Sequence, residues 1–180
     1  MWEKNDIQEV IVTEEQIQRR ARELGMQITK DYDGRSPLLI GLLRGSVPFM
    51  ADLIKAIDLD IQFDTMDVSS YEGTESTGEI RIVKDLDTPV RDLDIILVED
   101  IVDTGRTLSI VKANLLHRGA KSVAICTLLN KDARRTVDIK ADYIGFPCPD
   151  KFVVGYGMDF NQKYRCLPYI GALKPECYEK

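Results

Sequence analysis

One run of ten residues, VEDIVDTGRT at 98–107, joins an apolar stretch to acidic and hydroxyl side chains and a glycine. The apolar residues predict a buried strand, and Asp103-Thr104-Gly105-Arg106-Thr107 leads from it into a helix. Free backbone N–H groups and the positive end of the helix dipole bind phosphate at such a helix start. Gly105 permits close backbone approach, and the Thr104 and Thr107 hydroxyls add donors. We therefore predict a phosphate cradle, although Asp-Thr-Gly after a strand is also an ordinary helix cap.

Two carboxylates precede this turn. Glu99 and Asp100 stand together at the end of the predicted strand, where hard oxygen ligands can hold sugar hydroxyls or a magnesium ion. The run matches neither G-x-x-x-x-G-K-[ST] nor G-x-G-x-x-G, so a nucleoside triphosphatase or a dinucleotide site is not supported.

Composition limits the class of protein. The chain has 180 residues, of which 44% are hydrophobic and 30% charged, values typical of one folded domain with a core. A net charge of −6 disfavours a nucleic-acid scaffold that neutralises many phosphates. The apolar runs are too short to span a bilayer, and the polar start MWEKNDIQEV does not resemble a signal peptide. We expect a cytoplasmic protein that binds neither nucleic acid nor membrane.

The four cysteines lack the spacing of a zinc site, because no C-x-x-C pair is present and the chain has one histidine. We expect reduced thiols at Cys126, Cys148, Cys166 and Cys177. One disulfide among the last three is the alternative.

Strands and helices alternate along the middle of the chain. Thr13 and Gln16 form a capping box before an amphipathic helix at 14–29. Strands and helices then follow at 38–43 (strand), 47–57 (helix), 61–68 (strand), 79–86 (strand or hairpin arm), 94–100 (strand), 107–117 (helix), 122–130, 142–146 and 151–157 (strands). This order predicts an α/β domain with a mostly parallel sheet, whose ligands collect beyond the carboxyl ends of the strands. The polar segment 69–79 is expected to be a mobile loop.

The run at 98–107 resembles the signature of the phosphoribosyltransferases, in which two acidic residues among apolar ones precede D-T-G-x-T. Three further segments are similar to the hypoxanthine-guanine branch of that family: LLRGS (42–46), LLNK (128–131) and PDKFVVGYGMDFNQKYR (149–165). The resemblance implies the type I phosphoribosyltransferase fold. It also implies a single domain over 1–180, with a hood made of the N-terminal and C-terminal segments.

The same resemblance implies purine salvage: transfer of ribose 5-phosphate from phosphoribosyl diphosphate to hypoxanthine or guanine, giving IMP or GMP and pyrophosphate, with Mg2+. Glu99 and Asp100 would hold the ribose near the metal. The 5-phosphate would lie on Asp103, Thr104, Gly105, Arg106 and Thr107. Asp103 would also be the general base that takes the proton from N7 as N9 attacks the anomeric carbon.

The purine subsite is likewise implied by resemblance. Lys131 would donate to the exocyclic O6, which a 6-amino base cannot accept. Phe152 would stack on the base, and the Val153 backbone would read its edge. Asp159 would lie at the purine and contact the magnesium. Taken alone, these are ordinary surface charges and strand residues.

Pyrophosphate would be held by Arg44 and Gly45, in a turn whose family geometry includes a cis peptide between Leu43 and Arg44, and by Arg165. Ser70 and Tyr71 would head a lid, 69–79, that closes over phosphoribosyl diphosphate and excludes water. A plain flexible hairpin is the alternative. The Arg134-Arg135 pair is expected to face solvent rather than a neighbouring subunit.

Two other functions stay open. A regulator with this fold that binds RNA or DNA should carry a basic surface or an added binding segment, and this acidic chain shows neither. A relative that acts on xanthine, adenine or a pyrimidine would share the cradle and differ in the base pocket. A homodimer or homotetramer is expected by resemblance.

Overall fold

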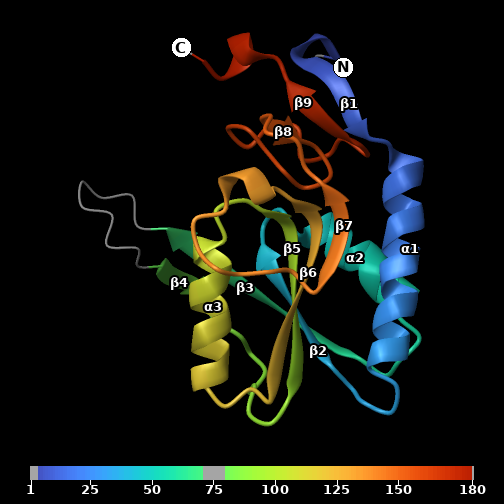
Figure 1. Ribbon diagram of the computed structural model, residues 1–180, viewed down its shortest axis with the longest axis vertical. Coiled ribbons are helices and arrows are strands. Elements are labelled where there is room, and N and C mark those ends of the chain that lie inside the picture. Colours follow the sequence, from blue (N-terminus) through green and yellow to red (C-terminus); the bar gives the residue numbers. More distant parts are fainter. Residues whose placement is uncertain (1–3, 71–79, 180) are drawn as a thin grey trace.

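The computed structural model describes residues 4–70 and 80–179 (Figure 1). Within them the main sheet has six strands in the order β4-β3-β2-β5-β6-β7. All neighbours are parallel except β3 and β4, which are antiparallel. The strands are β2 (Leu38–Leu43), β3 (Gln62–Ser70), β4 (Ile80–Lys84), β5 (Asp94–Val102), β6 (Ser122–Asn130) and β7 (Tyr143–Pro147).

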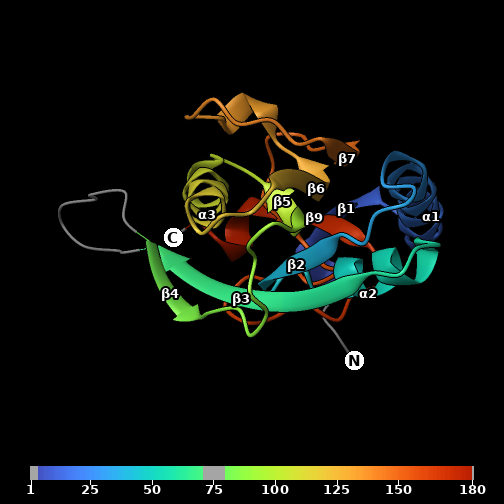
Figure 2. The same ribbon diagram turned by 90° about the horizontal axis from the view of Figure 1, so that it is seen from below.

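Helices cover both faces of this sheet, which explains why its central strands are apolar on both sides. On one face, α1 (Glu14–Asp31) and α2 (Val47–Ala56) pack on Leu39, Ile96 and Leu128. On the other face, α3 (Arg106–His117) packs on Ile40, Leu97 and Ile125 (Figure 2). Alternate residues of one strand therefore enter two different cores. The predicted α/β architecture is confirmed.

The direction in which successive strands are added to the sheet reverses between β2 and β5. From β2 it passes through α2 to β3, whereas from β5 it passes through α3 to β6, on the opposite side and opposite face. The loops that follow β2 and β5 therefore diverge and leave a crevice at the carboxyl ends of these strands. Such a switch point is the usual ligand site of an open α/β sheet.

A small sheet stands over this end of the main sheet (Figure 1). It pairs β1 (Ile7–Val12) with β9 (Ile170–Leu173), and β9 with β8 (Val153–Val154), all antiparallel. Val12 and Ile170 belong to the same core as α1 and α2, so the small sheet packs on the main body. The sequence did not predict β1 and β9 as strands, because they pair with each other across about 160 residues of chain.

The strand predicted at 151–157 is wrong in extent, since only β8 within it is a strand. Gly155, Tyr156 and Gly157 follow with φ of 101°, 48° and 100°, a left-handed turn that extended backbone excludes. The turn brings this segment back towards the end of β2.

Other expected boundaries agree within a few residues, and Thr13 and Gln16 form the predicted capping box. Cys126, Cys148 and Cys166 are free thiols, as expected. Among the described residues, no helix has the length and apolar character to cross a membrane. The expected lid lies mostly outside the described residues, and so does Tyr71; the Ser70 backbone ends β3 and pairs with Ile80.

Candidate active site

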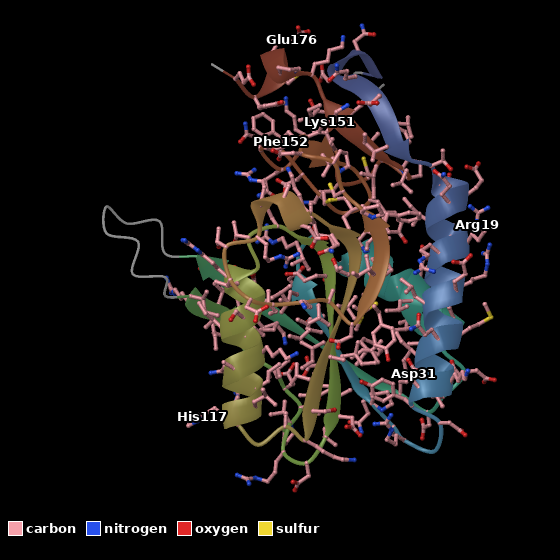
Figure 3. All side chains as sticks on the ribbon, in the orientation of Figure 1. Arg19, Asp31, His117, Lys151, Phe152 and Glu176 are labelled. Carbon is pink, nitrogen blue, oxygen red and sulfur yellow. The ribbon has the colours of Figure 1, made fainter. Side chains whose placement is uncertain are left out.

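A pocket of about 420 Å3 opens at the switch point, between the carboxyl ends of β5 and β6 and the small sheet. Figure 3 shows Lys151 and Phe152 at this end of the molecule, whereas His117, the last residue of α3, lies at the opposite end. His117 is therefore remote from the site. The pocket is lined by Asp100, Ile101, Asp103, Lys131, Arg134, Asp150, Lys151, Phe152, Val153, Met158, Asp159 and Tyr178.

Lys131 is held in place by its own neighbours. Its backbone N–H donates to the carbonyl of Val102, which ties the end of β6 to β5. The side chain is buried, and Nζ donates to the Lys151 carbonyl at 3.0 Å and pairs with Asp150 Oδ1 at 3.0 Å. An ammonium has three N–H donors. Two are used by these contacts, which leaves one for a ligand in the pocket.

Asp103 faces the same pocket from the loop after β5. Its Oδ1 is buried and accepts no hydrogen bond from the described residues; the nearest cation is Arg134, whose Nε lies 3.7 Å away. A buried carboxylate oxygen without a donor is costly unless a ligand supplies one. The Asp103 side chain as a whole is 41% exposed and lines the pocket, so the carboxylate can accept a proton or a hydrogen bond from a molecule bound beside Lys131.

A second pocket, of about 180 Å3, lies beside the first, with Asp103 lining both. Thr104, Gly105 and Thr107 line it at the start of α3, where the predicted cradle was placed. Gly105 is the N-cap residue, with φ of 81°, a conformation that favours glycine. Arg106 lines neither pocket, since its Nε donates to Thr136 Oγ1 at 3.2 Å. Only the backbone of Arg106 is thus available to the cradle.

Glu99 lines the smaller pocket and Asp100 the larger one. Burial raises the pKa of Glu99 well above its usual value, and the adjacent Asp100 charge adds to the effect. Burial also raises the pKa of Asp100. Two neighbouring carboxylates that cannot both ionise at low cost form a donor set that suits a divalent cation. Among the described residues, no three acidic, histidine or cysteine side chains gather closely enough to hold a metal by themselves.

The turn after β2 meets these carboxylates. A Cβ on Gly45 would collide with the Asp100 carboxylate, so only glycine permits this approach. The peptide between Leu43 and Arg44 is cis, as the resemblance implied. Arg44 is exposed.

Asp159 and Arg165 pair with each other, Arg165 Nη2 being 2.8 Å from Asp159 Oδ1. Arg165 also donates to the Gly157 carbonyl at 2.7 Å, which fixes the left-handed turn after β8. Asp159 shares the pocket lining with Asp100.

Phe152 has more aromatic neighbours than the sequence indicated. Tyr178 stacks on its ring at 4.9 Å between centroids, and Phe160 meets it edge to face at 5.4 Å. Val153 is buried in β8. Tyr178, Met158 and Asp150 were not predicted as site residues, and no local motif marks Tyr178, which reaches the pocket only because the chain end folds back over β8.

The expectation that Arg134 and Arg135 both face solvent is wrong for Arg135. Arg134 is exposed at the pocket rim, but only 15% of the Arg135 side chain is exposed. Arg135 turns inward against Gly105. A Cβ built on Gly105 would lie 3.1 Å from both Cδ and Nη1 of Arg135. Consecutive residues in this irregular segment point in opposite directions, which sequence alone does not reveal.

Comparison with known proteins gives the family. The family model described as "Phosphoribosyl transferase domain" matches residues 8–161. The hypoxanthine-guanine phosphoribosyltransferase of Bacillus subtilis is 54% identical over 177 residues, which are 98% of each chain. The bifunctional protein TilS/HprT of Listeria monocytogenes is 52% identical over 177 residues, and the chain spans only 27% of its length.

A crystal structure of a hypoxanthine phosphoribosyltransferase from Staphylococcus aureus superposes with a TM-score of 0.94 at 52% identity, over 98% of this chain and 96% of that one. The agreement extends over both sheets, and it confirms the type I phosphoribosyltransferase fold. The chain therefore belongs to the phosphoribosyltransferase family, in its hypoxanthine-guanine branch.

Proposed function

We propose that this chain transfers the 5-phosphoribosyl group from phosphoribosyl diphosphate to N9 of hypoxanthine or guanine, releasing pyrophosphate, as an enzyme of purine salvage. One observation carries the proposal. Lys131, with a free ammonium donor, and Asp103, with an unpartnered carboxylate oxygen, line one pocket that adjoins the cradle at the start of α3. This arrangement provides a base site and an adjoining phosphate site, with Asp103 lining both.

The reaction would proceed at the junction of the two pockets. The bond from the anomeric carbon to pyrophosphate breaks while N9 forms a bond to that carbon, and the sugar carries positive charge between the two events. The N7 proton passes to the Asp103 carboxylate, which lines the pocket and whose side chain is 41% exposed. The purine N–H becomes more acidic as N9 bonds to carbon, so a carboxylate suffices as the base. Positioning of the two substrates and stabilisation of the developing charge supply most of the remaining rate enhancement.

Selection of 6-oxopurines follows from Lys131. Its remaining N–H can donate to O6, whereas the 6-amino group of adenine offers only donors to it. Phe152 supplies an aromatic face, braced by Tyr178, and the Val153 backbone lies at the pocket edge. Guanine and hypoxanthine share the O6 that this subsite recognises.

Magnesium fits the acidic residues of the site. Glu99 and Asp100, whose pKa values are raised by burial, would hold the ion together with Asp159. A bound Mg2+ supplies charge neutralisation for the leaving pyrophosphate. Arg44, Gly45 and Arg165 would hold that pyrophosphate.

The remaining features of the proposal concern the whole chain. We propose that residues 1–180 form one domain with the small sheet as its hood, that 69–79 forms the lid with Ser70 and Tyr71 at its head, and that copies assemble as a homodimer or homotetramer. The free thiols of Cys126, Cys148 and Cys166 support a reducing, cytoplasmic location.

The test is nucleotide formation by the purified chain with Mg2+ and phosphoribosyl diphosphate, followed by absorbance with hypoxanthine, guanine, xanthine, adenine or uracil. Product with hypoxanthine and guanine is expected, with little from adenine or uracil. Absence of product with both 6-oxopurines would refute the proposal. Preference for xanthine, adenine or uracil would replace it with one of the related enzymes.

A further inference from the structure

Arg135 is a largely buried cation, with 15% of its side chain exposed, and its ion pair among the described residues is with an exposed carboxylate. Its Nη2 donates to Asn130 Oδ1 at 2.6 Å, and the nearest carboxylate, Asp132 Oδ1, lies 3.6 Å away on an exposed side chain. Nε and Nη1 are buried and have no hydrogen-bond partner among the described residues. Buried charges in proteins are normally paired or bound to a ligand, because leaving them unpaired is costly.

The guanidinium lies directly against the phosphate cradle. A Cβ on Gly105 would lie 3.1 Å from Arg135 Nη1, and Gly105 is the N-cap of α3. The next residue, Thr136, donates its backbone N–H to the Thr104 carbonyl at 3.1 Å. Arg135 therefore lies behind the cradle, on the side away from its opening, since it lines neither pocket.

The same segment also carries the base subsite. Asn130, which accepts from Arg135, is the last residue of β6, and Lys131 follows it. Asn130 Nδ2 donates in turn to Asp132 Oδ1 at 2.9 Å, so the backbone around Lys131 is held by this short network. Arg135 thus joins the loop that selects the base to the turn that holds the phosphate.

We propose that Arg135 is a positioning residue for the 5-phosphate group. Its charge supplements the backbone N–H groups of the cradle from behind, and a phosphate dianion bound there supplies a second counter-charge beside the exposed Asp132 carboxylate. The inference rests on the proposed function, because it assigns that 5-phosphate to the cradle. It also explains why one arginine of the 134–135 pair is buried while the other lies at the pocket rim.

The experiment separates a phosphate effect from a general structural one by comparing IMP with inosine, which lacks only the phosphate. Dissociation constants of both are measured by calorimetry for the wild-type chain and for Arg135→Met. IMP affinity is expected to fall about tenfold, equivalent to about 1.4 kcal/mol, with inosine affinity within twofold of wild type. Arg135→Lys, which keeps the charge, should lose less than half of that effect on a logarithmic scale.

Arg19→Met is the matched control, because it removes the same charge from an exposed position on α1 that Figure 3 shows on the outer surface. It should change neither affinity. If Arg135→Met does not fold, Arg135→Gln, which retains amide donors, replaces it under the same expectation.

Equal losses of IMP and inosine affinity in the uncharged variant would mean a structural role only and would overturn the inference. Unchanged IMP affinity would overturn it as well. Failure of the proposed function is recognised separately, since it appears as absence of transfer by the wild-type chain.

Discussion

Replacing Lys131 by methionine isolates the hydrogen bond on which base selection depends. The change keeps an unbranched apolar stem in a side chain that is only 6% exposed, and it removes the ammonium. Lys131 Nζ has one donor left after its contacts with the Lys151 carbonyl and Asp150. We expect that donor to be used by O6 of the bound base.

The magnitude follows from the kind of bond. A hydrogen bond from a charged group contributes about 1.5–3 kcal/mol. At about 1.4 kcal/mol per factor of ten, kcat/KM for hypoxanthine should fall about 10- to 150-fold. The Asp150 carboxylate left behind is 67% exposed and remains hydrated, so its lost ion pair adds little.

The assay is steady-state transfer with two bases, hypoxanthine and unsubstituted purine, which lacks the C6 acceptor. The variant should lose activity with hypoxanthine and keep that with purine within about threefold. Asp150→Asn is the control, since it removes the ion pair and keeps the ammonium; it should cost less than about threefold with either base. A variant Lys131→Met that retains hypoxanthine activity within about threefold, or loses both bases equally, would refute the role given to Lys131.

Three further outcomes are expected. Asp103→Asn should slow turnover by a factor on the order of 100 or more while IMP affinity, measured by calorimetry, stays near wild type; turnover close to wild type would remove Asp103 from proton transfer. Gly105→Ala should lower the free energy of unfolding in urea by more than Gly34→Ala does. Both glycines have positive φ, which costs alanine about 1–2 kcal/mol, but only at Gly105 would the new Cβ meet Ile139, at 2.5 Å; equal losses would contradict the packing described for the cradle. The hydrogen bond from Ser122, opposed by burial, lowers the pKa of Asp94 below its ordinary value of 3.8, so the stability that Asp94 contributes is present above that value and is lost as the pH falls through the lower folded pKa. Between pH 6 and pH 2, the free energy of unfolding from chemical denaturation should therefore fall less for Asp94→Asn than for wild type. Identical falls in the two proteins would contradict the stabilising role given to Asp94.

The sequence alone determined the features that depend on short stretches of chain. Thr13 and Gln16 marked the start of α1, the apolar run at 38–43 corresponded to β2, and the turn at 103–107 led into α3 where a cradle was predicted. Each of these is encoded by neighbours within a turn or a strand, so pattern and propensity suffice.

The tertiary structure alone decided how distant segments meet. β1 pairs with β9 across most of the chain, Tyr178 stacks on Phe152, and Gly45 packs against the Asp100 carboxylate. Arg135, expected in solvent, turned out to be buried behind Gly105. These contacts join residues far apart in sequence, and their free energy comes from burial and pairing that exist only when the whole fold forms, so no local pattern records them.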